Sequence, residues 1–102
     1  MNFKKVLTNG CISLNLKGST KKAIIEEMVD LLVSSGKIQD REGALNAVLE
    51  RERKMSTGMQ YGVAIPHGKT NAVADLVSVL GIKKDGIDFA AQDGNPSNIF
   101  VM

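Results

Sequence analysis

The chain has 102 residues, of which 43% are hydrophobic and 24% are charged, so we expect one globular domain with its own core. A net charge of +2, no Trp, one Tyr and three Phe argue against a nucleic-acid partner. One Cys and one His exclude an internal disulfide and a four-ligand structural zinc site, and no apolar run approaches membrane length. The composition therefore predicts a cytoplasmic domain that holds no metal or cofactor and does not insert into a membrane.

The N-terminal part of the chain predicts a strand. Residues 11–16 alternate between apolar and polar side chains, which is typical of a half-buried strand. We expect Ile12, Leu14 and Leu16 to face the core.

Two helices are predicted next. Apolar residues recur at helical spacing over residues 20–35, with Ser19 as the N-cap and Gly36 as the stop signal. Asp40 caps a second predicted helix over residues 41–54.

One arginine of the second helix shares the apolar side of that helix. Arg51 follows Ala44, Ala47 and Val48 by seven, four and three residues, so helix geometry places it within the apolar arc. A guanidinium there needs a carboxylate or a bound anion, or else it extends along the surface to reach water. Helix geometry alone leaves these alternatives open.

The only histidine follows a short apolar run. Residues 63–65 predict a buried strand, which Pro66 ends because proline has no backbone donor for a sheet. His67 comes at once, and Gly68 permits a sharp exit. An imidazole on such a loop is a candidate functional group, although a lone histidine is more often structural.

The remaining segments predict strands and turns. Residues 76–82 and 98–102 are apolar strands, and 87–89 is at best a short one. Residues 83–86, with Asp-Gly, indicate a hairpin turn, and 93–96 another turn. This order of elements predicts an α/β fold in which helices flank a mixed sheet.

The C-terminal residues are unusually apolar for a chain end. Ile99, Phe100 and Val101 would leave a strand uncovered, so we expect a domain that is incomplete at its C-terminus. Such an apolar surface could support self-association.

The candidate chemistry is phosphoryl transfer to histidine. The sequence contains neither of the glycine-rich nucleotide-binding motifs nor a Gly-x-Ser-x-Gly nucleophile motif. An imidazole is a competent nucleophile near neutral pH, and a guanidinium can balance charge on phosphoryl oxygens.

These residues resemble enzyme IIA of the sugar phosphotransferase system, of the fructose/mannitol type that includes nitrogen-regulatory paralogues. The resemblance covers most of residues 1–102, and its motifs are Arg51-Glu52, Ser56-Thr57-Gly58, Gly62 to Gly68, Gly86 to Phe89 and Asp93-Gly94-x-Pro96. It implies a phosphotransferase in which His67 accepts a phosphoryl group from the histidine-phosphocarrier protein and passes it to a IIB domain during sugar uptake. It also implies that Arg51 lies beside the phosphohistidine and that Ser56 and Thr57 form the pocket.

Two features depart from the family pattern. Gln60 stands where the family usually has glycine, and the family continues beyond this C-terminus with helical structure and a second active-site histidine. The alternative function is that of a regulatory nitrogen-type paralogue, which binds partners according to the phosphorylation of His67.

Overall fold

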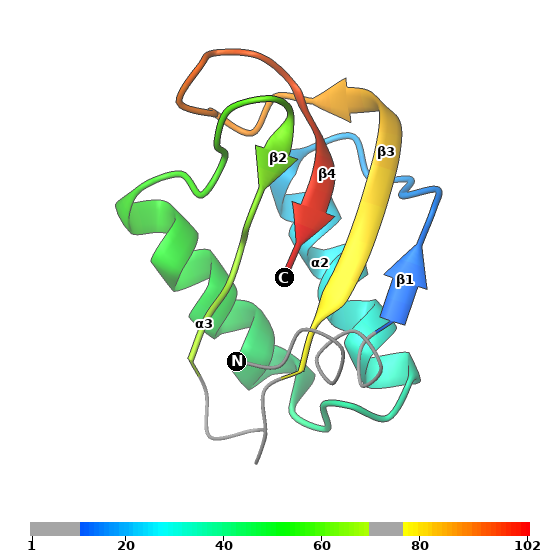
Figure 1. The fold of residues 1–102 in the computed structure, drawn as a ribbon. Coiled ribbons are helices and arrows are strands. Elements are labelled where there is room, and N and C mark those ends of the chain that lie inside the picture. Colours follow the sequence, from blue (N-terminus) through cyan, green and yellow to red (C-terminus); the bar gives the residue numbers. More distant parts are fainter. Residues whose placement is uncertain (1–10, 70–76) are drawn as a thin grey trace.

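The fold is an α/β arrangement of one sheet and two helices. The structure, a computed structural model, describes residues 11–69 and 77–102. In chain order its elements are β1 (Cys11–Ser13), α2 (Lys21–Ser34), α3 (Arg41–Lys54), β2 (Val63–Ala64), β3 (Val79–Ile87) and β4 (Ser97–Val101) (Figure 1). The described residues include no helix that combines the length and apolar character needed to cross a membrane.

The four strands confirm the predicted mixed sheet. Their spatial order is β1-β3-β4-β2. β1 runs parallel to β3, β4 runs antiparallel to β3, and β2 runs parallel to β4. Met102 extends the β3–β4 pairing, because its backbone N–H and carbonyl both bond Val79, at 2.9 and 3.0 Å. Strand β2, which leads into the histidine segment, stands at one end of this order and is therefore an edge strand.

Local capping signals set the helix boundaries. The Asp40 side chain accepts the Gly43 N–H at 3.0 Å, as predicted, and Gly36 ends α2 with a φ of +77°. The predicted Ser19 cap is wrong by one residue. Thr20 has the extended backbone of an N-cap, and its hydroxyl accepts the Ala23 N–H at 3.1 Å.

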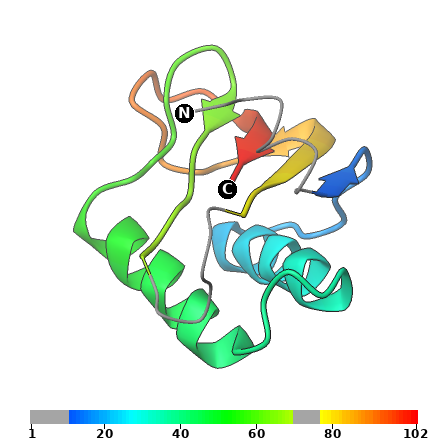
Figure 2. The same ribbon diagram turned by 60° about the horizontal axis from the view of Figure 1, so that its bottom comes forward.

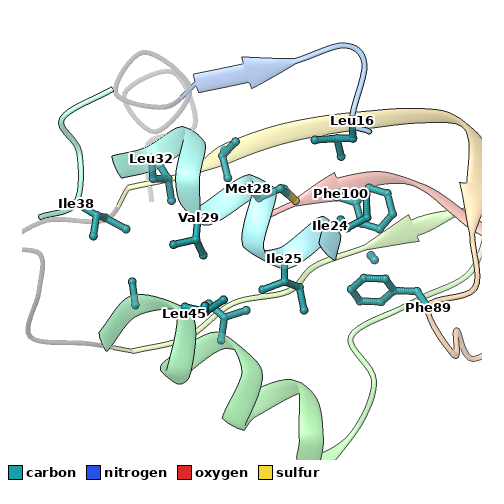
Figure 3. Close-up of a cluster of buried hydrophobic side chains, with 14 of the residues drawn as sticks. Leu16, Ile24, Ile25, Met28, Val29, Leu32, Ile38, Leu45, Phe89 and Phe100 are labelled. Atoms are coloured by element: carbon teal, nitrogen blue, oxygen red, sulfur yellow. The ribbon is translucent and has the colours of Figure 1, made fainter. Parts of the chain in front are cut away.

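The core lies between the helices and one face of the sheet. Figure 2 shows α2 and α3 on the same side of the sheet. Their apolar stripes meet Leu16, Phe89 and Phe100 (Figure 3). The two phenylalanine rings pack with centroids 5.3 Å apart and planes tilted by 56°.

The predicted inward face of residues 11–16 is wrong for two of its three side chains. Leu16 is 1% exposed, but Ile12 and Leu14 are 59% and 66% exposed. The three-residue edge strand ends at Ser13, and the Leu16 N–H then bonds the Ile82 carbonyl at 2.8 Å. This change of direction brings only Leu16 under the sheet.

The predicted hairpin turn at 83–86 is also wrong, because these residues lie inside β3. Ile82 pairs with Ile99 and Ile87 with Ser97, so five steps along β3 oppose two along β4. The extra residues form a bulge, with Gly86 at a φ of +72°. The predicted short strand 87–89 contributes only its first residue to β3, and the predicted start of the 76–82 strand lies outside the described residues.

Strand β4 has one covered face and one exposed face. Phe100 is fully buried against the helices, so the expectation that it is uncovered is wrong. Ile99 and Val101 alternate to the other face and are 38% and 41% exposed, as expected. Self-association through this face stays a prediction.

Candidate functional site

His67 lies on the segment that leaves β2, with its side chain exposed. Strand β2 ends at Ala64, and the following Pro66 is buried. The ring Nδ1 is 2.8 Å from the Ile65 carbonyl oxygen. Because a carbonyl can only accept, Nδ1 carries the hydrogen, and in the neutral ring Nε2 has a free lone pair. The local backbone therefore selects the tautomer in which Nε2 is the nucleophilic nitrogen.

The His67 segment runs alongside α3, as both Figure 1 and Figure 2 show. A Cβ added at Gly68 would lie 2.8 Å from Ala47 C and from Val48 N, both of them backbone atoms of the helix. Only glycine permits this approach without a shift. Because Ala47 precedes Arg51 by one helical turn, the Gly68 contact and Arg51 lie on the same face of α3.

Arg51 is a half-exposed residue at the end of α3. Its Nη1 donates to the Met55 carbonyl at 2.8 Å, and among the described residues it has no ion pair. The other N–H groups of the guanidinium can therefore donate hydrogen bonds to a bound anion. Arg51 lies at the border of the buried face and not within it, and its place beside the phosphohistidine stays a prediction.

The hydroxyls of Ser56 and Thr57 hold the loop that follows α3. Ser56 Oγ donates to the Phe89 carbonyl at 2.6 Å and accepts the Gly58 N–H at 3.0 Å. The Thr57 hydroxyl donates to the Glu52 carboxylate. Each hydroxyl thus uses its hydrogen within the fold, and direct contact of these hydroxyls with a phosphoryl group stays a prediction.

Glu52 is a buried charge that the sequence interpretation missed. It is 7% exposed and accepts the Thr57 N–H at 2.8 Å, the Thr57 hydroxyl and the Lys21 ammonium at 2.7 Å. Burial raises the pKa of Glu52, but the hydrogen bonds from Lys21 and Thr57 outweigh it, so the pKa lies below the usual glutamate value. The signal was available, because Glu52 follows Val48 by four residues and Leu45 by seven.

The loop that starts at Thr57 folds back onto β2. The Thr57 carbonyl accepts the Ile65 N–H at 3.1 Å, and Gly58 forms an antiparallel bridge with Ala64. Tyr61 and Gly62 turn the chain with φ values of +62° and +75°. The loop and the histidine segment thus form one hydrogen-bonded unit. No group of three potential metal ligands lies together in the described ranges.

Comparison with known proteins gives the family. The family model described as "Phosphoenolpyruvate-dependent sugar phosphotransferase system, EIIA 2" matches residues 5–102. The chain belongs to this family. This EIIA 2 chain is 42% identical over 91 residues to the PTS system fructose-specific EIIA component of Haloferax volcanii, a match that covers 89% of the chain and 59% of that protein. It is 39% identical over 102 residues to the PTS system fructose-specific EIIABC component of Bacillus subtilis, over 100% of the chain and 16% of that protein.

Solved structures share the fold of this EIIA 2 chain. The nitrogen regulatory protein IIA-Ntr of Neisseria meningitidis superposes with a TM-score of 0.76 at 26% identity, over 97% of this chain and 67% of that one. The IIA mannitol structure from Escherichia coli gives 0.75 at 26% identity, over 88% and 64%. The chain thus spans less than two thirds of the length of the curated relatives named above.

Proposed function

We propose that this chain is the phosphocarrier domain of a sugar phosphotransferase system, and that Nε2 of His67 accepts the phosphoryl group. The observation that carries the proposal is the Nδ1 contact with the Ile65 carbonyl, which leaves Nε2 of an exposed ring as the nucleophile. Membership of the EIIA 2 family supports the same role.

The phosphoryl group passes between nitrogen nucleophiles without a net change of oxidation state. The Nε2 lone pair attacks the phosphorus of the donor phosphohistidine on the histidine-phosphocarrier protein, and the donor N–P bond breaks as the new one forms. The Nδ1–H of His67 keeps its hydrogen bond to the Ile65 carbonyl, which holds the ring in place. Arg51 donates to the phosphoryl oxygens and balances their charge.

The next acceptor is a IIB domain that serves uptake of a fructose- or mannitol-type sugar. The Bacillus subtilis relative is a fructose-specific EIIABC component, whose name combines A, B and C parts. The location that fits these partners is the cytoplasm.

A second candidate is regulation of the nitrogen type. This chain is 27% identical over 99 residues to a nitrogen regulatory protein of Pseudomonas aeruginosa, and the Neisseria meningitidis structure has a similar fold. Both functions use the same histidine. The higher identity to the fructose-specific relatives, 42% and 39%, favours sugar transport.

The test is phosphorylation by purified components. Incubation with phosphoenolpyruvate, enzyme I and the phosphocarrier protein should give an acid-labile label, which ³¹P NMR should assign to Nε2. His67→Ala should abolish the label, whereas Asn46→Ala, an exposed change on α3, should keep it. Transfer of the label to a fructose-type IIB domain would support transport over regulation. Equal labelling of His67→Ala and the parent would refute the proposal.

A further inference from the structure

We propose that Glu52 is a positioning residue for His67, acting through Thr57 and Ile65 to maintain the ring tautomer that leaves Nε2 free. The importance of this role for transfer rests on the proposed function. The tautomer itself can be measured without any transfer reaction.

An unbroken series of hydrogen bonds joins the carboxylate to the imidazole. Glu52 accepts the N–H of Thr57 at 2.8 Å and also its hydroxyl. The Thr57 carbonyl accepts the Ile65 N–H at 3.1 Å, and the Ile65 carbonyl lies 2.8 Å from Nδ1 of His67. A shift of Thr57 therefore moves the residue whose carbonyl selects the tautomer. Partners of this kind, one step removed from a functional group, commonly set its orientation.

The position of Glu52 requires a carboxylate and not only a polar side chain. Three donors converge on its two oxygens: the Thr57 N–H and the Lys21 ammonium on Oε2, and the Thr57 hydroxyl on Oε1. A glutamine offers one acceptor oxygen and no negative charge, so the charge-assisted bonds from Thr57 and Lys21 become weaker even where its NH₂ group donates to the Thr57 hydroxyl. Glu52→Gln should therefore loosen the hold on Thr57 while keeping the side-chain volume.

A purely structural role for Glu52 makes a different prediction. The ion pair between Lys21 on α2 and Glu52 on α3 joins the two helices. If that were its only purpose, Glu52→Gln and Lys21→Met would both lower stability and leave the histidine ring unchanged. In the positioning role, Lys21→Met keeps both bonds from Thr57 to Glu52, so it should lower stability but preserve the tautomer.

The single histidine makes the measurement unambiguous. With ¹⁵N-labelled histidine, the ring signals belong to His67 alone, and they should be recorded about two pH units above the usual imidazole pKa. The parent should show a protonated Nδ1 and an unprotonated Nε2. Glu52→Gln should lower the ratio of the Nδ1–H to the Nε2–H tautomer by about tenfold and slow phosphorylation by about 10- to 100-fold.

The matched control is Glu50→Gln on the same helix, because Glu50 has a 58% exposed side chain and, within the part of the chain that the structure describes, pairs only with Arg53, at 3.0 Å. It should keep both the tautomer and the rate. Thr57→Val removes only the hydroxyl bond to Glu52, so it should change the tautomer ratio in the same direction by a smaller amount. It takes the place of Glu52→Gln if the Glu52 variant does not fold. Parental ring signals in Glu52→Gln, or in Thr57→Val where that variant replaces it, would overturn the inference. A shifted tautomer alongside an unphosphorylated parent would instead refute the proposed function and leave the positioning role standing.

Discussion

Substitution of Gly68 by alanine should displace the histidine from its place beside α3. The added Cβ would lie 2.8 Å from Ala47 C and Val48 N, whereas non-bonded carbon atoms normally approach to about 3.5–4.0 Å. These atoms belong to the helix backbone and cannot rotate away, so the loop must move by about 1 Å. A displacement of 1 Å at a reacting group can cost about 10²-fold in rate. Overpacking should also cost about 1–3 kcal/mol of stability.

Transfer from the phosphocarrier protein and urea denaturation measure these two effects of Gly68→Ala. The matched control is Gly36→Ala at the end of α2, where a Cβ has open space but the backbone φ is +77°. That control should cost about 1 kcal/mol through backbone strain alone and keep its transfer rate. A Gly68→Ala variant with parental transfer and parental stability would show that the loop does not pack against α3 as described.

Three further predictions concern the charges and the core. Arg51→Lys should reduce transfer by about tenfold, and Arg51→Ala by more, because the guanidinium fork is lost. The melting temperature should change little, since Arg51 is half-exposed and makes one hydrogen bond, to the Met55 carbonyl. An unchanged transfer rate would refute the role of Arg51. The stability that Glu52 contributes should be complete above its unfolded-state pKa of about 4.3 and should fall as the pH drops through its lower folded-state pKa. Glu52→Gln should flatten this part of a plot of unfolding free energy against pH. Identical plots for the variant and the parent would contradict the lowered pKa. Phe100→Ala should cost about 3–5 kcal/mol in urea denaturation, and Ile99→Ala clearly less; equal losses would contradict the two-faced burial of β4.

The helices could be predicted because their signals are local. Asp40 reaches its Gly43 partner within three residues, and Gly36 ends α2 through its own backbone conformation. The predicted range 41–54 is the observed range of α3. Such signals need no knowledge of distant contacts.

The sheet was harder to predict because its geometry depends on partners far along the chain. Asp85-Gly86 fits a hairpin turn, but the positive φ of Gly86 serves equally well in a bulge opposite β4. The choice between the two depends on how β4 pairs. In the same way, Leu16 is buried and Leu14 exposed because the chain bends after β1, which the alternation of residues 11–16 does not show.

The local geometry of the candidate site could be predicted where its residues are adjacent in sequence, and not where they are remote; the roles of these residues stay a prediction. His67, Pro66 and Gly68 form a continuous motif that the sequence shows directly, although the contact that requires glycine at position 68 is with Ala47 and Val48 of α3. The bond from Ser56 to the Phe89 carbonyl spans 33 residues, and no local pattern indicates it. Glu52 could have been found by the argument applied to Arg51, because both lie near the apolar arc of one helix.

The side chains of the adjacent Arg51 and Glu52 leave α3 in different directions, because neighbouring residues on a helix lie about 100° apart. A buried carboxylate near a phosphoryl site would repel the phosphoryl group if its charge were unbalanced. The Lys21 ammonium, 2.7 Å from Glu52, cancels that charge within the fold. Arg51 has no carboxylate partner among the described residues, so its charge is available for a bound anion, as the proposed function requires. Loss of Arg51 should therefore weaken stabilisation of the phosphoryl group in a correctly oriented site, whereas loss of Glu52 should leave the positive charge in place and alter the nucleophile.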